Sequence, residues 1–270
     1  MFPSFQLLGK EISTYMVMTV LGGLSVGLLL YVTTQKPEYR RDQWLHILLA
    51  SAAGAFVGAH ILFFFTRLPA FWQLVTHWNT YIHSLQDVFT AFQLLFGGMV
   101  YYGGLFGALV GGWLYCRSLK IDFALHLDAV VPGIPLFHTF GRIGCLLAGC
   151  CYGVESPYGW LFPYSPLADH TVRYFPLQLV EAGCNFLLFW LLLYLSGKRI
   201  PKGKMLWLYF PLYGAVRFTL EFWRGDAVRG IYFGLSTSQW ISLILMVISA
   251  AVWLREYQKG SRSTVTAPHT

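Results

Sequence analysis

Seven long apolar runs, almost free of charge, limit what this chain can fold into. Each approaches or exceeds the roughly 20 residues that an α-helix needs to cross a bilayer. Only 11% of the residues are charged and 56% are hydrophobic, whereas soluble domains are about 25% charged. The runs are Ile12–Thr34, Gln43–Thr66, Val88–Cys116, Phe123–Gly141, Tyr174–Gly197, Met205–Leu220 and Leu235–Leu254. We therefore expect an all-α polytopic membrane protein with about seven transmembrane helices.

The loop charges predict how these helices are oriented. Twelve of the nineteen Lys and Arg residues fall on one side of a seven-span arrangement: Lys36, Arg40, Arg41, Arg117, Lys120, Lys198, Arg199, Lys202, Lys204, Arg255, Lys259 and Arg262. The positive-inside rule assigns that side to the cytoplasm, so the N-terminus lies outside and the C-terminus inside. Because the basic residues are spread over short loops and do not share one face, we expect no binding of nucleic acid.

The segments on the opposite side predict an outward-facing cap. Residues 67–87, 154–173 and 222–234 are longer than the basic loops and contain Trp, Tyr and Pro. Trp and Tyr favour the membrane interface, so short interfacial helices are expected there. We expect one integral membrane domain over residues 1–258 and a disordered cytoplasmic tail over 259–270, which is polar.

Charged residues at the outer ends of two runs are the first candidates for a functional site. Arg142 stands in the fourth run, and Arg217 and Glu221 stand in or beside the sixth. Tyr213, Arg217 and Glu221 are spaced by four and share one face of a helix. An Arg217–Glu221 pair can simply hold the helices together. Alternatively, two arginines with Glu181 nearby form a polar pocket, and the guanidinium fork suits the oxygens of a lipid phosphate.

The stretch from His138 to Gly153 gathers further reactive side chains. His138, Arg142, Cys145 and Gly149 recur on one helical stripe, and Cys150 and Cys151 follow. No CxxC pair is present and only one histidine is near, so the spacing predicts no metal site. No other cofactor is expected. Adjacent Cys150 and Cys151 either form a vicinal disulfide or are inert, and the sequence leaves both open.

Glycines in two runs recur at four-residue spacing. Gly103, Gly107 and Gly111 form one such ridge, and Gly54 and Gly58 form another. Such ridges are typical of close helix packing in membranes. A second interpretation concerns Gly103 and Gly104, which follow two tyrosines and can make room for a lipid headgroup.

Several ordered pieces of the chain, from Tyr15 to Trp253, resemble the prolipoprotein diacylglyceryl transferase family. The pieces are GGMVYYGGLFG at 97–107, DAVVPGIPLFHTFGRIG at 128–144, the closing glycine of GCCYG at 149–153, FPLQLVEA at 175–182, YGAVRFTLEFWR at 213–224 and STSQWISL at 236–243. Each piece is weak alone, and their order makes the resemblance specific.

The resemblance implies a reaction and its partners. The family transfers the diacylglyceryl group of phosphatidylglycerol to the lipobox cysteine thiol of preprolipoproteins, releasing glycerol phosphate at the outer leaflet. It therefore implies a bacterial cytoplasmic (inner) membrane. Phosphatidylglycerol or a similar anionic phospholipid, the preprolipoprotein signal peptide and membrane lipid are the implied partners.

The resemblance also assigns residues. Arg142 and Arg217 correspond to positions that clamp the lipid phosphate. Six further residues coincide with family positions: Tyr15, Gly153, Gln178, Glu181, Tyr213 and Glu221. Fixed guanidinium groups in a dry site would stabilise the charge that builds on the leaving phosphate oxygens.

The chain departs from the family where acid–base chemistry is expected. The family's motif reads roughly GRxGNFxNGExxG, whereas this chain has GRIGCLLAGCCYG. Cys145 and Ala148 replace two asparagines, Cys150 replaces an acidic residue, and Tyr102 replaces a histidine before a double glycine. His138, one turn before Arg142, is a candidate replacement for the lost base, since imidazole titrates near neutrality.

These departures leave three functions open. The first is the usual transferase reaction with a reshaped proton path. The second is a related phospholipid-dependent transferase with another acceptor, working through a covalent intermediate on Cys145 or Cys150. The third is a lipid-binding or transport protein that has lost catalysis.

Overall fold

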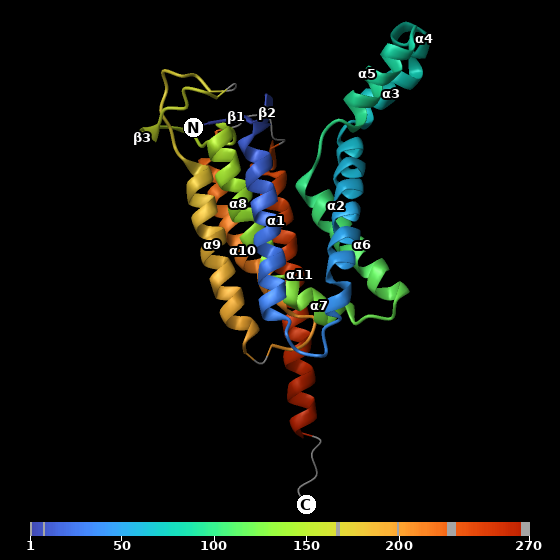
Figure 1. Ribbon diagram of the computed structural model, residues 1–270, viewed down its shortest axis with the longest axis vertical. Coiled ribbons are helices and arrows are strands. Elements are labelled where there is room, and N and C mark those ends of the chain that lie inside the picture. The colour runs from blue at the N-terminus through green and yellow to red at the C-terminus, as the bar shows by residue number, and fades with distance from the viewer. Residues whose placement is uncertain (1, 8, 166–167, 199, 226–230, 266–270) are drawn as a thin grey trace, which may run out of the picture. The chain divides into compact units, whose positions relative to one another are not determined.

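The computed structural model of the chain describes all residues except 1, 8, 166–167, 199, 226–230 and 266–270 (Figure 1). The chain divides into two compact units: residues 1–35 together with 124–270, and residues 36–123. The expected single membrane domain over residues 1–258 stays a prediction. Part of the tail expected to be disordered, 266–270, lies outside the described residues.

The first unit is a helical bundle with small strand pairs. Its elements are β1 (Ser4–Leu7), β2 (Lys10–Ser13), α1 (Thr14–Thr33), α7 (Phe123–Val130), α8 (Gly133–Ala148), β3 (Glu155–Trp160), α9 (Leu177–Ser196), α10 (Met205–Leu220), η2 (Glu221–Trp223), β4 (Ile231–Tyr232), β5 (Leu235–Ser236) and α11 (Thr237–Val265). Strands β1 and β2 pair antiparallel, as do β4 and β5. Helix α8 packs against α1 and α9, and α10 packs against α9 and α11.

The second unit is built on one helix pair. Its elements are η1 (Arg41–Gln43), α2 (Trp44–Thr66), α3 (Leu68–Thr76), α4 (Trp78–Tyr81), α5 (Leu85–Phe96) and α6 (Tyr101–Ser118). Helices α2 and α6 lie side by side along their length. A Cβ on Gly54, Gly58, Gly103 or Gly107 would collide with backbone of the facing helix. The packing predicted for the two glycine ridges is therefore present.

Five helical segments among the described residues are long and apolar enough to cross a membrane: Thr14–Thr33, Arg41–Thr66, Phe123–Ala148, Leu177–Ser196 and Thr237–Gln258. Helices α6 and α10, the remaining two expected spans, pack along α2 and α11. Large apolar side chains point outward from these helices, including Leu24 at 66% exposure and Leu187 at 71%. Outward apolar side chains suit lipid as the surrounding solvent. The predicted class, an all-α polytopic membrane protein, is confirmed.

One of the seven predicted spans is wrong in detail. The run Val88–Cys116 is not one helix: α5 ends at Phe96, and α6 begins at Tyr101. Gly97 and Gly98 fall between them. Glycine disfavours the helix interior because it loses more conformational entropy on ordering than any other residue. A second break falls at Pro132, between α7 and α8; proline has no backbone N–H to donate within a helix.

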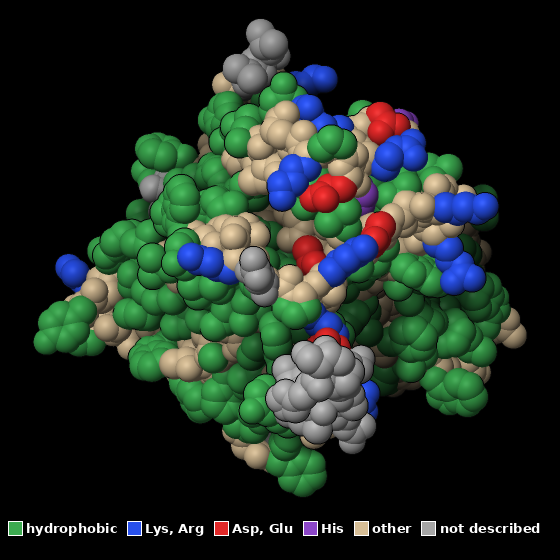
Figure 2. Space-filling view, turned by 90° about the horizontal axis from the view of Figure 1, so that it is seen from below, with side chains coloured by type: hydrophobic (Ala, Val, Ile, Leu, Met, Phe, Trp, Pro, Cys, Tyr) green, Lys and Arg blue, Asp and Glu red, His purple; other side chains and the backbone are tan. Residues whose placement is uncertain are grey.

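Figure 2 views the molecule from below Figure 1, towards the end where α11 finishes. Lys and Arg side chains lie on this face beside Asp and Glu side chains, with hydrophobic side chains visible around them. One ion pair near the end of the α11 span joins Lys204 Nζ to a carboxylate oxygen of Glu256 at 3.0 Å. Charged ends and apolar flanks are the pattern that a bilayer requires.

The α2–α6 contact yields a first prediction. Gly107→Ala places a methyl group against the backbone of Gly54, and such overpacking costs about 1–3 kcal/mol. We expect a lower midpoint of thermal unfolding in detergent. Gly27→Ala on α1 is the control, since a Cβ there meets nothing within 4 Å and alanine favours helix. Equal midpoints for the two variants would contradict tight α2–α6 packing.

Candidate active site

The candidate site lies in the first unit, where three helices bury charged side chains against one another. Arg142 stands near the end of α8, Glu181 on the first turns of α9, and Arg217 on the last turn of α10. Glu181 is 1% exposed and Arg217 6%. Gln178, Glu181 and Asn185 recur at three- and four-residue spacing, so one face of α9 carries all three polar groups.

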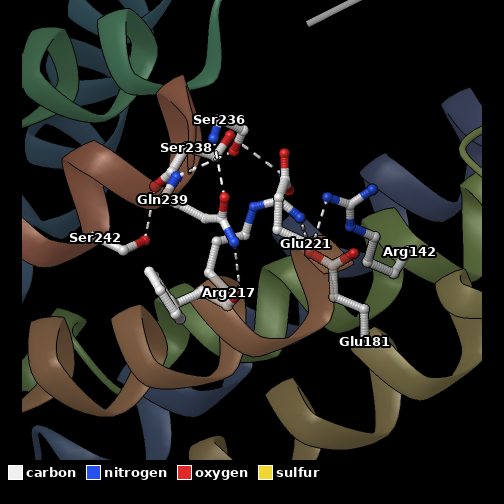
Figure 3. Close-up of polar contacts among 9 residues, drawn as sticks. Arg142, Glu181, Arg217, Glu221, Ser236, Ser238, Gln239 and Ser242 are labelled. Atoms are coloured by element: carbon white, nitrogen blue, oxygen red, sulfur yellow. Dashed lines mark hydrogen bonds and ion pairs between the residues drawn. The ribbon is translucent and has the colours of Figure 1, made fainter. Parts of the chain in front are cut away.

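Glu181 joins the two arginines (Figure 3). Its Oε1 lies 2.9 Å from Nη2 of Arg142 and 3.6 Å from Nη1 of Arg217. Arg217 also pairs with Glu221, Nη2 to Oε2 at 2.5 Å, and donates a hydrogen bond to the Ser238 hydroxyl at 3.3 Å. Both interpretations of the sequence are thus present together: Arg217–Glu221 is a buried ion pair, and it belongs to a larger polar cluster.

A third arginine adds positive charge beside Glu181. Arg224, which follows η2, interacts electrostatically with Glu181 and with Cys151. The guanidinium groups of Arg142, Arg217 and Arg224 thus lie around the buried Glu181 carboxylate. Guanidinium groups form strong charge-assisted hydrogen bonds with phosphate, so this arrangement favours a further anion.

Several buried polar atoms in the cluster have no hydrogen-bond partner among the described residues, and Nε of Arg142 and Oε1 of Gln178 are two of them. An unmade hydrogen bond of a buried group costs about 1–3 kcal/mol, more for a charged one. Nε of Arg142 can donate to a phosphate oxygen without breaking the pair with Glu181. The cluster can therefore bind an anion at Arg142. Arg217 is already paired with Glu181 and Glu221.

The loop after α8 brings further groups to this place. Gly149 adopts a left-handed conformation, φ +73°, and ends α8. Gln178 donates from Nε2 to the Cys150 carbonyl at 2.7 Å, which ties the loop to α9. Gly153 then pairs with two strand-like segments: its N–H donates to Phe175, and it bridges to Arg224. Gln178 and Gly153 thus fix the backbone around the cluster.

This packing predicts the effect of a single methyl group. A Cβ on Gly153 would lie 2.6 Å from the Trp223 carbonyl oxygen and 3.0 Å from Cβ of Phe175. Gly153→Ala must push the loop away from η2 and Arg224, so we expect kcat/KM to fall by at least 10-fold, since misplacement of about 1 Å can cost 10²-fold. Gly183→Ala on α9 is the control, because a Cβ there meets nothing within 4 Å. Wild-type activity for Gly153→Ala would contradict the positioning role.

The three central cysteines meet beside the arginines. The sulfur atoms of Cys145, Cys150 and Cys151 all lie within 4.8 Å of one another, and none forms a disulfide. The vicinal Cys150–Cys151 disulfide considered from the sequence is therefore not formed here. Hydrogen bonds from Cys145 and Cys150 hold the pKa of the Cys151 thiol below its ordinary value, and Arg142 and Arg224 act in the same direction.

Aromatic and imidazole side chains line the same region. Tyr15, on the first turn of α1, packs against Gly144 and interacts electrostatically with Arg142 and the three cysteines. The ring of His138 lies 5.4 Å from that of Tyr213, which in turn stacks on Tyr209. His138 also faces Arg142, Glu181 and Arg217. Its role as a general base stays a prediction.

The remaining predicted residues lie in the second unit. Tyr102, Gly103 and Gly104 begin α6, and Gly103 and Gly104 pack against α2. Their roles in catalysis and substrate binding stay predictions.

Two residues of the cluster were not among the predicted site residues. Arg224 continues the stripe of Tyr213, Arg217 and Glu221 by three residues, so its spacing contained the signal. Ser238 carries no such signal, because only the fold of β5 and α11 places its hydroxyl beside Arg217.

Comparison with known proteins agrees with the resemblance seen in the sequence. A family model described as prolipoprotein diacylglyceryl transferase matches residues 3–255. A phosphatidylglycerol–prolipoprotein diacylglyceryl transferase of Clostridium tetani (strain Massachusetts / E88) is 34% identical over 251 residues, covering 92% of this chain and 95% of the relative. A protein of Clostridium perfringens (strain 13 / Type A) with the same name, numbered 2, is 33% identical over 261 residues, covering 96% of each.

Proposed function

Because the chain belongs to the prolipoprotein diacylglyceryl transferase family, we propose that it transfers the diacylglyceryl group of phosphatidylglycerol to the lipobox cysteine thiol of preprolipoproteins. The observation that carries this proposal is the cluster of Arg142, Arg217 and Arg224 around the buried carboxylate of Glu181. Such a cluster has the charge to hold one phosphate diester in an apolar setting.

The reaction makes specific demands on this cluster. The thiol of the acceptor cysteine loses its proton to water, its sulfur attacks the glyceryl carbon that bears the phosphate, and the C–O bond breaks. Glycerol phosphate leaves with the bonding electrons, so negative charge grows on its oxygens. Arg142, with an unpartnered Nε, is the donor placed to stabilise that charge, and Glu181 and Glu221 hold Arg217 in position. Preorganised donors of this kind are effective where water is excluded.

Substrate access follows from the predicted orientation. We infer that the N-terminus lies outside a bacterial inner membrane and the C-terminus in the cytoplasm, as the twelve basic loop residues indicate. In this orientation the end of α8, the loop to Gly153 and η2 would lie at the outer leaflet. Phosphatidylglycerol would enter from the bilayer, and the signal peptide of the preprolipoprotein would bring its cysteine to the same level.

A direct assay tests the proposal. Purified protein in detergent is incubated with phosphatidylglycerol and a lipobox peptide, and the mass of the peptide is measured by mass spectrometry. We expect a thioether-linked diacylglyceryl peptide, and none from the same peptide with its cysteine replaced by serine. A folded, lipid-binding preparation that modifies no peptide would rule out the transferase and favour a lipid-binding or transport protein.

A further inference from the structure

The three-cysteine cluster is a group of reactive side chains beside the site that the proposed reaction does not use. Its three sulfur atoms lie within 4.8 Å of one another. Cys145 lies on the last turn of α8, and Cys150 and Cys151 belong to the loop that follows. The other two cysteines of the chain, Cys116 and Cys184, lie on α6 and α9. An arrangement of three thiols this close is suited to a shared ligand.

The backbone that assembles the cluster is unusual. The N–H of Cys150 bonds back to the carbonyl of Cys145 at 3.1 Å, across the left-handed Gly149. Cys151 is itself left-handed, with φ +59°, a conformation that costs a residue other than glycine roughly 1–2 kcal/mol. Strained residues persist where a functional arrangement holds them. Here the left-handed backbone at Gly149 and Cys151 brings the three thiols close together.

The geometry and the surrounding charge fit a soft metal ion. Three thiolates on tetrahedral Zn²⁺, with Zn–S of about 2.3 Å, would stand about 3.8 Å apart, so small side-chain movements complete the site. Arg142 faces Cys145 and Cys151, and Arg224 faces Cys151. These cations offset the net negative charge of a divalent ion bound by three thiolates. Thiolate ligands select zinc and similar thiophilic ions over magnesium or calcium.

We propose that Cys145, Cys150 and Cys151 bind one Zn²⁺ ion through three thiolates and leave its fourth position open. Structural zinc sites fill all four positions with protein ligands, whereas three ligands and an open position are typical of catalytic zinc. The sequence spacing predicted no metal site because it lacks CxxC. The left-handed backbone at Gly149 and Cys151 brings the three sulfur atoms together, and sequence spacing alone does not indicate this.

The open position suits the acceptor thiol, an assignment that rests on the proposed function. A thiol that binds zinc is deprotonated outright, its proton passing to water. The bound thiolate then attacks the glyceryl carbon, the C–O bond to phosphate breaks, and glycerol phosphate departs beside Arg142. The metal would thus replace the acidic residue and asparagine that Cys150 and Cys145 displace from the family's motif.

Titration with Co²⁺ tests the site without reference to activity. Reduced, metal-free protein in detergent should take up one Co²⁺ per chain and show the near-ultraviolet sulfur-to-cobalt charge-transfer band, and Zn²⁺ should abolish the band. Cys150→Ser/Cys151→Ser should lose the band, whereas the control Cys184→Ser should keep it. Absence of the band in reduced wild-type protein, or its persistence in the double variant, would overturn the proposal. Cysteines that bind no metal after reduction and form a disulfide on purification would overturn it too.

Adding the lipobox peptide to the Co²⁺ form tests the fourth position. We expect a stronger charge-transfer band with the cysteine peptide and no change with its serine version, and an unchanged spectrum with both would refute acceptor binding. The two proposals fail separately. Full transfer by metal-free protein would end the assignment of the open position to the acceptor thiol and leave the transferase standing. A zinc-loaded protein that modifies no peptide would end the transferase.

Discussion

Replacing Arg142 with alanine should lower kcat/KM for diacylglyceryl transfer by about 10²–10³-fold, the loss typical when one donor to a developing oxyanion is removed. Arg142 is the guanidinium of the cluster whose Nε has no partner among the described residues. Its removal therefore takes away the group placed to meet the phosphate as charge grows. Initial rates of peptide modification over a range of phosphatidylglycerol concentrations measure the effect.

The Arg142→Ala protein should remain folded, which makes the kinetic loss interpretable. Glu181 keeps an ion-pair partner in this variant, since Nη1 of Arg217 lies 3.6 Å from the same carboxylate oxygen. Arg142→Lys should recover only part of the rate, because an ammonium lacks the planar fork. Arg255→Ala, an exposed arginine of α11, serves as the control with wild-type rates. Activity within 3-fold of wild type for Arg142→Ala would show that the phosphate binds elsewhere.

Replacing Glu181 with glutamine should have the largest effect on stability. Glu181 is the bridge between Arg142 and Arg217, and its side chain is 2% exposed. Removing one partner of a buried charge network costs about 3–5 kcal/mol. In this variant Arg142 loses its carboxylate partner, whereas Arg217 keeps its pair with Glu221. We expect the midpoint of thermal unfolding in detergent to fall by roughly 10 °C, at about 2–4 °C per kcal/mol.

The same variant offers a test of anion binding. Glycerol phosphate should raise the unfolding midpoint of Glu181→Gln more than that of wild type, because its phosphate can take the place of the lost carboxylate. Glu256→Gln is the matched control: it breaks the Lys204–Glu256 pair, whose side chains are 20% and 27% exposed, and pairs open to solvent contribute only about 0–1 kcal/mol. An unchanged midpoint for Glu181→Gln would contradict the bridging role.

The sequence predicted those features of the fold that depend on local pattern. The apolar runs located α1, α2, α9 and α10 closely. The four-residue spacing of Tyr213, Arg217 and Glu221 predicted that they share a face, and all three are buried. The break between α5 and α6 was missed, because the apolar run continues unbroken through Gly97 and Gly98.

The site depends on features that no local pattern expresses. Cys145, Cys150 and Cys151 lie together because Gly149 and Cys151 adopt left-handed backbone conformations. The hydropathy pattern does not indicate backbone angles. Likewise, Glu181 lies between two arginines because α9 packs between the helices that carry them. The sequence could name Glu181 as one charge in the pocket, but its bridging geometry required the packed helices.

The ratio of products tests the central claim most directly. Purified protein with phosphatidylglycerol and a lipobox peptide is sampled over time, and diacylglyceryl peptide and glycerol phosphate are quantified in the same samples. We predict one glycerol phosphate released for each peptide modified, with both products falling together in Arg142→Ala. Glycerol phosphate released without peptide modification, or modified peptide without glycerol phosphate, would contradict it.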